Sequence, residues 1–375
     1  MSSPRNDLAS SPAERLRKLR LGSLLVGVIA SVPCIMAALG EPTRFMQAYL
    51  VAWIFTLGVS MGSLGVLLLH RVSGGAWGNA ITRFAERGSA LVPVLALAFI
   101  PIAIDLPRLY LWAQPDVVSA DEVLQEKAIY LNPESFRLRA AGYLVLWSLL
   151  AIVLRGSRRW KLPGNVSGVG MAVYFLTSTF AAVDWIMSLE PHWFSSTFGA
   201  MFVVGQALSG LSFCVLAYVS YSTAPAAGSL ARKVLRDLNN LVLAFVMLWA
   251  YIAFTQYLII YYGNLAEEAV WYVERTEGGW EWISLVLIAF HYAVPFLALV
   301  GGAGKENPKV LGWITAGILL VHWFDIYWLI IPAFSPGHLE FSWLEPTVAI
   351  AMGAWWLAAW SWQPGALEPM AEAGA

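Results

Sequence analysis

Three ionisable side chains lie inside apolar stretches of the sequence, where such residues are rare. His322 and Asp325 are three positions apart in the sequence HWFD, and His291 lies in an earlier apolar stretch. A spacing of three places His322 and Asp325 on the same face of a helix. An ionised carboxylate favours the charged imidazole whereas burial disfavours it, so such a pair can exchange protons near neutral pH. The alternatives are a buried pair that fixes helix packing and, for His291, a hydrogen bond to a carbonyl freed by Pro295.

A second group of ionisable residues lies in the stretch AAVDWIMSLEPHWFSST (181–197), between two long apolar runs. A bilayer tolerates ionisable groups at such a place only when they are paired or hydrated. We expect Asp184 to contribute to a proton path. We expect Glu190 and His192 to lie at the outer surface, where a turn-stabilising role is the alternative. Asp105 is a further outer-surface candidate, with a helix-end role as its alternative.

Tyr257 is the remaining candidate for a proton path, because with its polar neighbours it would extend such a path outward along its helix. Interhelical packing is the alternative for a polar or aromatic residue in a helical bundle. No comparable set of ionisable residues rises from the opposite side, so the sequence favours a half-path over a complete channel. If their helices adjoin, four residues would form a ladder from the outer third of the membrane to its midplane: Asp184, Asp325, His322 and His291.

The elements that position these residues are membrane helices. Of 375 residues, 59% are hydrophobic and 13% are charged, whereas about 25% are charged in an average soluble domain. This composition predicts an all-α, polytopic membrane protein. The net charge of −1 argues against nucleic-acid binding. Cys34 and Cys214 form no CxxC or CxxCH motif, so we expect no haem, iron–sulfur cluster or metal site in this chain.

A membrane span needs about 20 mainly apolar residues. The sequence predicts about ten such spans within 21–362, with cytoplasmic tails at 1–20 and 363–375. The one long connection, 106–137, is acidic, and we expect it to carry a short surface helix. The predicted spans are 21–39, 45–69, 88–106, 138–154, 166–188, 194–221, 238–262, 280–300, 309–333 and 342–362.

The basic residues set the predicted orientation. Most of the 23 Lys and Arg residues fall in the N-terminal tail and in alternate loops. Because positively charged loops stay in the cytoplasm, we place both termini there. The turn at 184–193 and the acidic loop at 106–137 then face outward.

Two motifs of the sequence are specific, DWIMSLEPHW (184–193) and HWFDIYW (322–328). The glycine-rich second span is less specific, although its Gly58 and Gly62 indicate close helix contact. Together these segments resemble the ActF-like subunits of bacterial alternative complex III, a family similar to the NrfD and polysulfide-reductase membrane subunits. The resembling segments cover almost the whole chain in order: 48–78, 127–147, 180–199, 243–264, 290–296 and 322–334.

The resemblance implies a ten-helix subunit, with two four-helix bundles plus peripheral helices, in the bacterial inner membrane. Such a subunit belongs to a quinol:electron-acceptor (cytochrome c-type) oxidoreductase complex and is not catalytic alone. It binds no redox cofactor of its own, and the resemblance leaves open a quinone or quinol site at or near it. The implied partners are a sister NrfD-like membrane subunit, an iron–sulfur protein and multihaem cytochrome subunits, which hold the haem and iron–sulfur groups. By this resemblance, the proton-path candidates in this chain are Asp184, His322, Asp325 and His291.

Two other functions remain open from the sequence. One is a secondary transporter, which inverted repeats and interrupted helices near the midplane would support. Prolines occur within the predicted spans, but no matching pair of interrupted helices is visible in the two halves. The other is a purely structural scaffold subunit of the complex.

Overall fold

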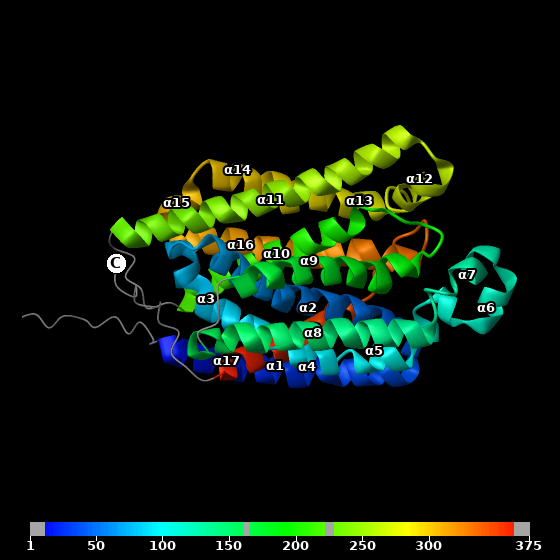
Figure 1. Cartoon of the computed structure of the whole chain (residues 1–375), viewed down its shortest axis with the longest axis horizontal. Helices are drawn as coiled ribbons and strands as arrows, with labels where there is room; N and C mark the ends of the chain where they lie inside the picture. Colours follow the sequence, from blue (N-terminus) through cyan, green and yellow to red (C-terminus); the bar gives the residue numbers. More distant parts are fainter. Residues whose placement is uncertain (1–11, 161–164, 222–228, 364–375) are drawn as a thin grey trace, which may run out of the picture.

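The computed structural model describes residues 12–160, 165–221 and 229–363. Regular structure within these ranges is helical, and the long helices lie side by side along the longest axis of the molecule (Figure 1). Nine described segments are long and apolar enough to cross a membrane. The chain is therefore a multi-span helical membrane protein, as its composition predicts. Of the two predicted tails, residues 1–11 and 364–375 lie outside the described residues.

Each of the first nine predicted spans corresponds to one of these segments. The fourth, predicted at 138–154, is longer in the structure because α8 begins at Pro133. Asn132 Oδ1 accepts a hydrogen bond from the Ser135 N–H at 2.9 Å and so caps this helix, and proline suits the first helical position. The uninterrupted spans are α1 (Pro12–Gly40), α2 (Pro42–Ser73), α8 (Pro133–Trp160), α9 (Asn165–Trp185), α10 (Phe198–Tyr221), α11 (Ser229–Gly263) and α16 (Pro308–Ile330).

The helices α2 and α10 form the centre of the bundle. Their apolar stretches are 94% and 83% buried, whereas that of α1 is 22% buried. A Cβ added at Gly62 of α2 would lie 1.8 Å from the Gln206 carbonyl oxygen of α10. The two backbones therefore touch, as the glycine spacing of the second span predicts. Because α10 also packs against α9, α11 and α16, it lies between the polar groups described below.

The third span is divided into three short helices. Pro93 and Pro101 cause the two breaks, because a proline has no N–H to donate to the carbonyl four residues earlier. Each proline stands in the first turn of the helix that follows a break. The predicted span at 88–106 covers only the later part of this segment, since charged residues lower the apolar content of the first helix. The three pieces are α3 (Ala76–Ser89), α4 (Val92–Leu97) and α5 (Ile100–Ile104).

The eighth span changes its helix type in the middle. It consists of α13 (Trp280–Val286), a π-helical segment η4 (Leu287–Ala293) and α14 (Val294–Val300). Pro295 has no N–H for the carbonyl of His291, and the wider π turn keeps the proline ring away from that carbonyl. Single π turns within longer helices are frequent at functional sites.

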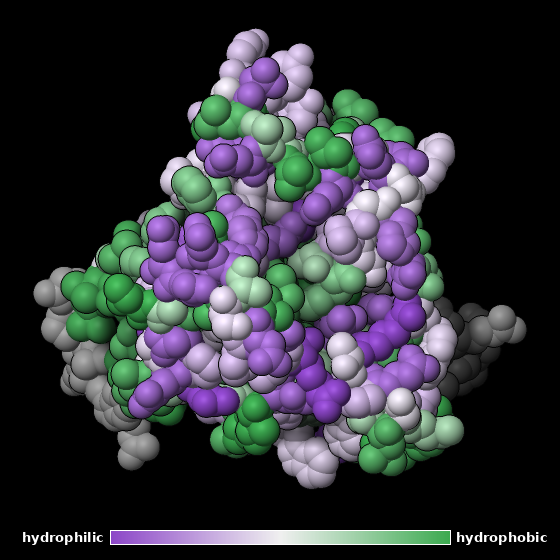
Figure 2. All heavy atoms as spheres, turned by 90° about the vertical axis from the view of Figure 1, so that its right-hand side faces the viewer, coloured by the Kyte–Doolittle hydropathy of each residue, from purple (hydrophilic) through white to green (hydrophobic). Residues whose placement is uncertain are grey.

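The long loop after the third span projects from one end of the bundle (Figure 1). It carries two short α-helices, where the sequence predicts one. Asp121 Oδ1 caps the second of them by accepting hydrogen bonds from the N–H groups of Val123 and Leu124. Hydrophilic residues cover much of this end, with apolar residues toward its margins (Figure 2), as expected where a bundle leaves the membrane. The elements of the loop are η1 (Leu106–Arg108), η2 (Leu111–Ala113), α6 (Pro115–Ala120) and α7 (Glu122–Lys127).

The tenth predicted span, 342–362, forms the helix α17 (Leu344–Trp362), which packs along α1 and against α2. It is not among the nine segments, because Glu345, Pro346 and its tryptophans lower the mean hydropathy of a helix of only 19 residues. A tenth crossing and the division into two four-helix bundles therefore stay predictions. The remaining short elements are η3 (Met187–Leu189), α12 (Ala266–Val273), α15 (Ala303–Glu306) and η5 (Ile331–Ala333).

Candidate functional site

His291, His322 and Asp325 lie together in the interior and are called the histidine cluster below. The imidazoles of His291 on η4 and His322 on α16 are nearly parallel, with their centroids 5.6 Å apart. Asp325 Oδ2 lies 3.3 Å from His322 Nδ1, one turn along the same helix. His291 is fully buried, and the other two residues are at most 4% exposed. The structure therefore brings together three of the four residues predicted to form a ladder.

Three further helices enclose the histidine cluster. The Trp249 ring of α11 meets His291 edge to face, with centroids 4.1 Å apart. Phe55 of α2 lies 6.1 Å from His322 between ring centroids. Gly205 of α10 leaves the room that the imidazole occupies, because a Cβ there would lie 3.0 Å from His322 Cε1. The walls are thus aromatic and apolar, and they shield the two imidazoles from bulk solvent.

The polar atoms of this cluster have unused hydrogen-bonding capacity. Both nitrogens of His291 and Nε2 of His322 lack a hydrogen-bond partner within the described part of the chain, and His322 Nδ1 has only the ion-pair contact with Asp325 at 3.3 Å. The indole N–H of Trp249, whose ring contacts His291, also lacks one. Buried polar side-chain atoms are hydrogen-bonded in the large majority of cases. Several open donors and acceptors in one place therefore mark a site that can take up a proton, a water molecule or a polar ligand.

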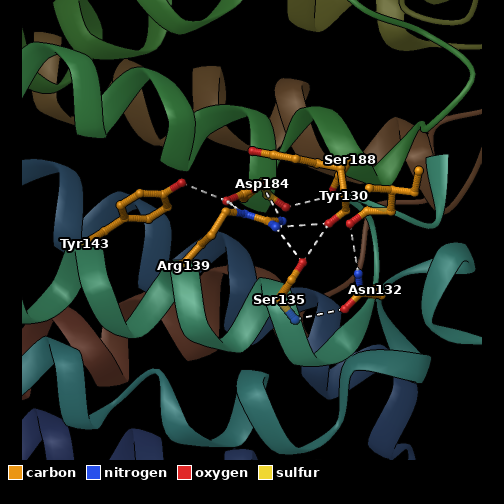
Figure 3. Close-up of polar contacts among 8 residues, drawn as sticks. Tyr130, Asn132, Ser135, Arg139, Tyr143, Asp184 and Ser188 are labelled. Carbon is orange, nitrogen blue, oxygen red and sulfur yellow. Dashed lines mark hydrogen bonds and ion pairs between the residues drawn. The ribbon is translucent and has the colours of Figure 1, made fainter.

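Asp184 of α9 belongs to a different polar group, with partners from α8 and the preceding loop (Figure 3). Its carboxylate is fully buried and accepts hydrogen bonds from Arg139 Nε at 2.9 Å and Nη2 at 3.0 Å. The Tyr143 hydroxyl donates to the same carboxylate at 3.1 Å. A two-pronged arginine contact of this kind is strong and directional. No hydrogen bond or ion pair among the described residues joins Asp184 to the histidine cluster, so the predicted ladder is not continuous.

The loop residue Tyr130 extends the Asp184 group outward. Arg139 lies 3.8 Å above the Tyr130 ring and donates a hydrogen bond to its backbone carbonyl. Burial and the nearby Asp184 carboxylate raise the pKa of Tyr130 to about 12, so the phenol stays neutral at physiological pH. The group is consequently an ion pair enclosed by neutral hydroxyls.

Glu190 holds the turn at 184–193 to the ends of two other helices. Arg275 is fully buried and contacts both Glu190 oxygens, at 3.2 Å and 2.6 Å. The Trp271 indole N–H donates to Glu190 Oε2 at 2.9 Å. Arg275 also donates to the backbone carbonyls of Trp328 and Leu329 at the end of α16. This arrangement fits the turn-stabilising alternative for Glu190.

His192 and Asp105 lie at the same end of the bundle. His192 Nε2 is 2.8 Å from Asp121 Oδ2, and Lys127 Nζ donates to the Pro191 carbonyl at 2.6 Å. These contacts join the long loop to the turn at 184–193. Asp105 ends α5 and pairs with Arg108, three residues further on, as a helix-end role requires.

Tyr257 does not touch the histidine cluster. Its side chain is 41% exposed, and its ring packs against those of Tyr261 and Tyr272 at centroid distances of 5.8 Å and 5.3 Å. The neighbouring Gln256 is buried and accepts a hydrogen bond from Thr197 at 3.3 Å. The geometry of Tyr257 therefore fits the packing alternative, and its place in a proton path stays a prediction.

Sequence reasoning missed Arg139 and Arg275 as the partners of Asp184 and Glu190. The signal was present, because a carboxylate within a span implies a cation nearby. Arg139 also shares a helix face with Tyr143, four residues later. The sequence held no signal for Trp249, one of many aromatic residues in the chain.

Comparison with protein-family models gave no match for this chain, and comparison with curated proteins gave none either. The resemblance to ActF-like subunits thus rests on the motifs quoted above. Both specific motifs map to the polar groups just described. DWIMSLEPHW contains Asp184 and Glu190, and HWFDIYW contains His322 and Asp325.

Proposed function

We propose that this chain is an inner-membrane subunit of a bacterial quinol:electron-acceptor oxidoreductase and that its histidine cluster exchanges protons. The carrying observation is the pair of buried, stacked imidazoles with open nitrogens, one of them 3.3 Å from the carboxylate of Asp325. The motif resemblance supports the class of complex. The π-helical turn that carries His291 supports a functional role for this place.

The charges of the histidine cluster favour one mobile proton. If Asp325 is ionised, one protonated imidazole makes the group neutral, which is the cheapest state in a low-dielectric interior. A second proton would place two positive imidazoles side by side at a ring distance of 5.6 Å. His291 and His322 can therefore hold a single proton between them. Because the nitrogens of stacked rings point outward in the ring planes, transfer from one imidazole to the other would need a bridging water molecule.

The proposed complex supplies the redox chemistry. In this proposal the haem and iron–sulfur groups belong to multihaem cytochrome and iron–sulfur subunits, and a sister NrfD-like subunit packs beside this chain in the bilayer. Quinol oxidation releases protons, and a membrane site that binds protons reversibly can accept or pass them on. This chain would contribute that site and no electron carrier.

Purification tests the complex. The tagged chain is isolated from its native membranes in mild detergent, and haem absorbance and mass spectrometry identify the proteins that accompany it. We expect multihaem and iron–sulfur proteins together with quinol-oxidising activity. A lone, colourless protein from an intact preparation would contradict this proposal.

Variants in the assembled complex test the histidine cluster. His322→Gln and Asp325→Asn should lower proton translocation about a hundred-fold, the lower end of the effect of removing a general acid or base. His192→Gln is the matched control, because His192 is an exposed histidine outside the membrane. The proton role is wrong if quinol turnover and proton translocation are unchanged in both cluster variants.

A secondary transporter is the second candidate, and the interrupted helices favour it. The third span is broken at Pro93 and Pro101, and the eighth contains η4. Transporters place substrate sites at interrupted helices near the midplane. Accumulation of a solute by vesicles that contain only this chain would support the transporter. The oxidoreductase function, in contrast, requires the other subunits of the complex.

A further inference from the structure

The seam between α1 and α17 is closed in the middle and open on either side. Trp355 of α17 lies on Gly27 of α1, where an added Cβ would be 3.2 Å from the indole. The indole N–H donates to Ser31 Oγ at 3.1 Å. On one side of this contact is a groove of about 430 Å³ and on the other a smaller one of about 230 Å³. A Cβ added at Gly22 or Gly353, in the larger groove, would meet nothing within 4 Å.

The larger groove opens onto the lipid-facing surface. The apolar stretch of α1 is 22% buried, and Leu21, Leu25 and Ile29 are each more than half exposed. A helix that is apolar on its outward face lies among acyl chains or against another apolar surface. Water has few polar partners in such a groove. Its occupant must accordingly be largely apolar.

One end of the groove is basic. Lys18 lines the groove and is exposed. No ion pair among the described residues involves Lys18 or the adjacent Arg17. Arg20 lies 5.2 Å from the Trp362 ring on α17, which keeps a third cation at this end of the seam. An occupant with a negatively charged head and an apolar tail would match both parts of the groove.

The length of the groove matches one leaflet. It extends along α1 from Lys18 to Val26, about 12 Å at about 1.5 Å of rise per residue. Half of a hydrocarbon core about 30 Å thick is about 15 Å. Its volume also falls within the range of about 300–1,000 Å³ found for small-molecule sites. The predicted orientation puts this end at the cytoplasmic leaflet, which carries the anionic lipids.

We propose that this groove binds one anionic phospholipid of that leaflet, with an acyl chain beside Gly22 and Gly353 and the phosphate at Lys18. The proposal does not depend on the electron-transfer function. A zwitterionic lipid or a helix of another protein would be the competing occupants.

The test uses the full-length chain in detergent, with phosphatidylglycerol and phosphatidylcholine of identical acyl chains as probes. Native mass spectrometry counts bound lipid, and thermal melts follow its effect. We expect phosphatidylglycerol to bind more tightly and to raise the melting temperature. Gly353→Leu should abolish both effects by filling the groove, whereas Gly142→Leu, at an exposed glycine of α8 with equally free space, should not.

Lys18→Gln tests the headgroup contact separately. It should weaken phosphatidylglycerol binding about fivefold and leave phosphatidylcholine binding unchanged. Lys233→Gln, at an exposed lysine of α11, is the control and should change neither. Lys18→Gln alters only an exposed side chain. It therefore tests anionic-lipid binding even if Gly353→Leu does not fold.

Three outcomes would overturn the proposal. The first is equal binding of the two lipids. The second is phosphatidylglycerol binding by Gly353→Leu as tight as by Gly142→Leu. The third is a co-purified protein that crosslinks to Gly22→Cys in place of bound lipid.

Discussion

Asp184 and Asp325 are both buried carboxylates, yet their partners give them different chemistry. Arg139 and Tyr143 donate three hydrogen bonds to Asp184. Asp325 has His322 at 3.3 Å, a partner that is charged only when protonated. A permanent cation stabilises the ionised form of a carboxylate, whereas a titratable partner allows both groups to change state. Asp325 is consequently the better candidate for proton exchange, and Asp184 has a mainly structural geometry.

Removing the charge of Asp184 should destabilise the chain. Asp184→Asn leaves Arg139 with an uncompensated charge at a side chain only 20% exposed. We expect a loss of about 3 kcal/mol, the lower end of the range for breaking a buried ion pair. Thermal or denaturant melts of the purified chain measure it. Asp105→Asn, which breaks an exposed pair with Arg108, is the control and should cost less than about 1 kcal/mol; equal losses would show that burial is not the cause.

Glu274 should make the stability of the outer end depend on pH. Burial and the neighbouring Glu190 carboxylate raise the pKa of Glu274 above its usual 4.5. The folded chain thus binds this proton more tightly than the unfolded chain, and the resulting stability is present below pH 4.5 and lost as the pH rises through the raised pKa. Glu274→Gln should therefore raise the melting temperature at pH 7.5 and have little effect at pH 4.

The control for that change is Glu277→Gln, at an exposed residue of the same loop. It should leave the melting temperature within error of the original at both pH values. An equal gain for Glu274→Gln at pH 4 and pH 7.5 would contradict an electrostatic cause.

The residue types of the site were predictable, but their partners were only partly so. The pairing of His322 with Asp325 follows from helical spacing and is seen in the structure. The contact between His291 and His322 joins two helices. The spacing of residues in the sequence gives the position of each residue along its own helix, but it does not say which helices are neighbours. For the same reason the sequence placed Asp184 in one ladder with the cluster, although its ion-pair partner in the structure is Arg139 of α8.

At the scale of elements, the contact between α2 and α10 depends on the absence of side chains. Gly62→Ala would place a Cβ 1.8 Å from the Gln206 carbonyl oxygen, which the backbone cannot avoid without separating the helices. We expect a loss of about 3 kcal/mol, the upper end for overpacking. Size-exclusion chromatography and melts measure it. Gly58→Ala, one turn away with its nearest contact at 3.7 Å, should cost less than about 1 kcal/mol; similar losses would exclude a steric cause.

The spans themselves were predictable because bilayer thickness fixes how many apolar residues a crossing needs. The exceptions have local physical causes. The sequence did not predict α3 as part of the third span, because α3 carries charged residues. The bundle buries or pairs these residues; Arg87, for example, is 6% exposed. The π-helical turn was not foreseen either, since Pro295 predicts a kink but not the hydrogen-bond pattern that relieves it.

At the scale of the whole molecule, the two ends of the bundle differ. The end that bears α6, α7 and α12 is held by polar contacts between loops, including Glu190 with Arg275 and His192 with Asp121. It presents a hydrophilic surface (Figure 2). The opposite end carries the basic residues of α1 and the lipid groove. The histidine cluster lies between them, so the direction in which it exchanges protons depends on which end faces the cytoplasm.

The distribution of basic residues predicts that the end with α6 and α7 faces outward. Glu122→Cys on α7 and Lys233→Cys on α11 place thiols at exposed positions of opposite ends. The native Cys34 and Cys214 are buried, so a membrane-impermeant maleimide should not reach them. In intact cells it should label the cysteine at position 122 and reach the one at 233 only after the membrane is opened. The reverse pattern would invert the orientation, move the lipid groove to the outer leaflet and remove the anionic-leaflet argument for its occupant.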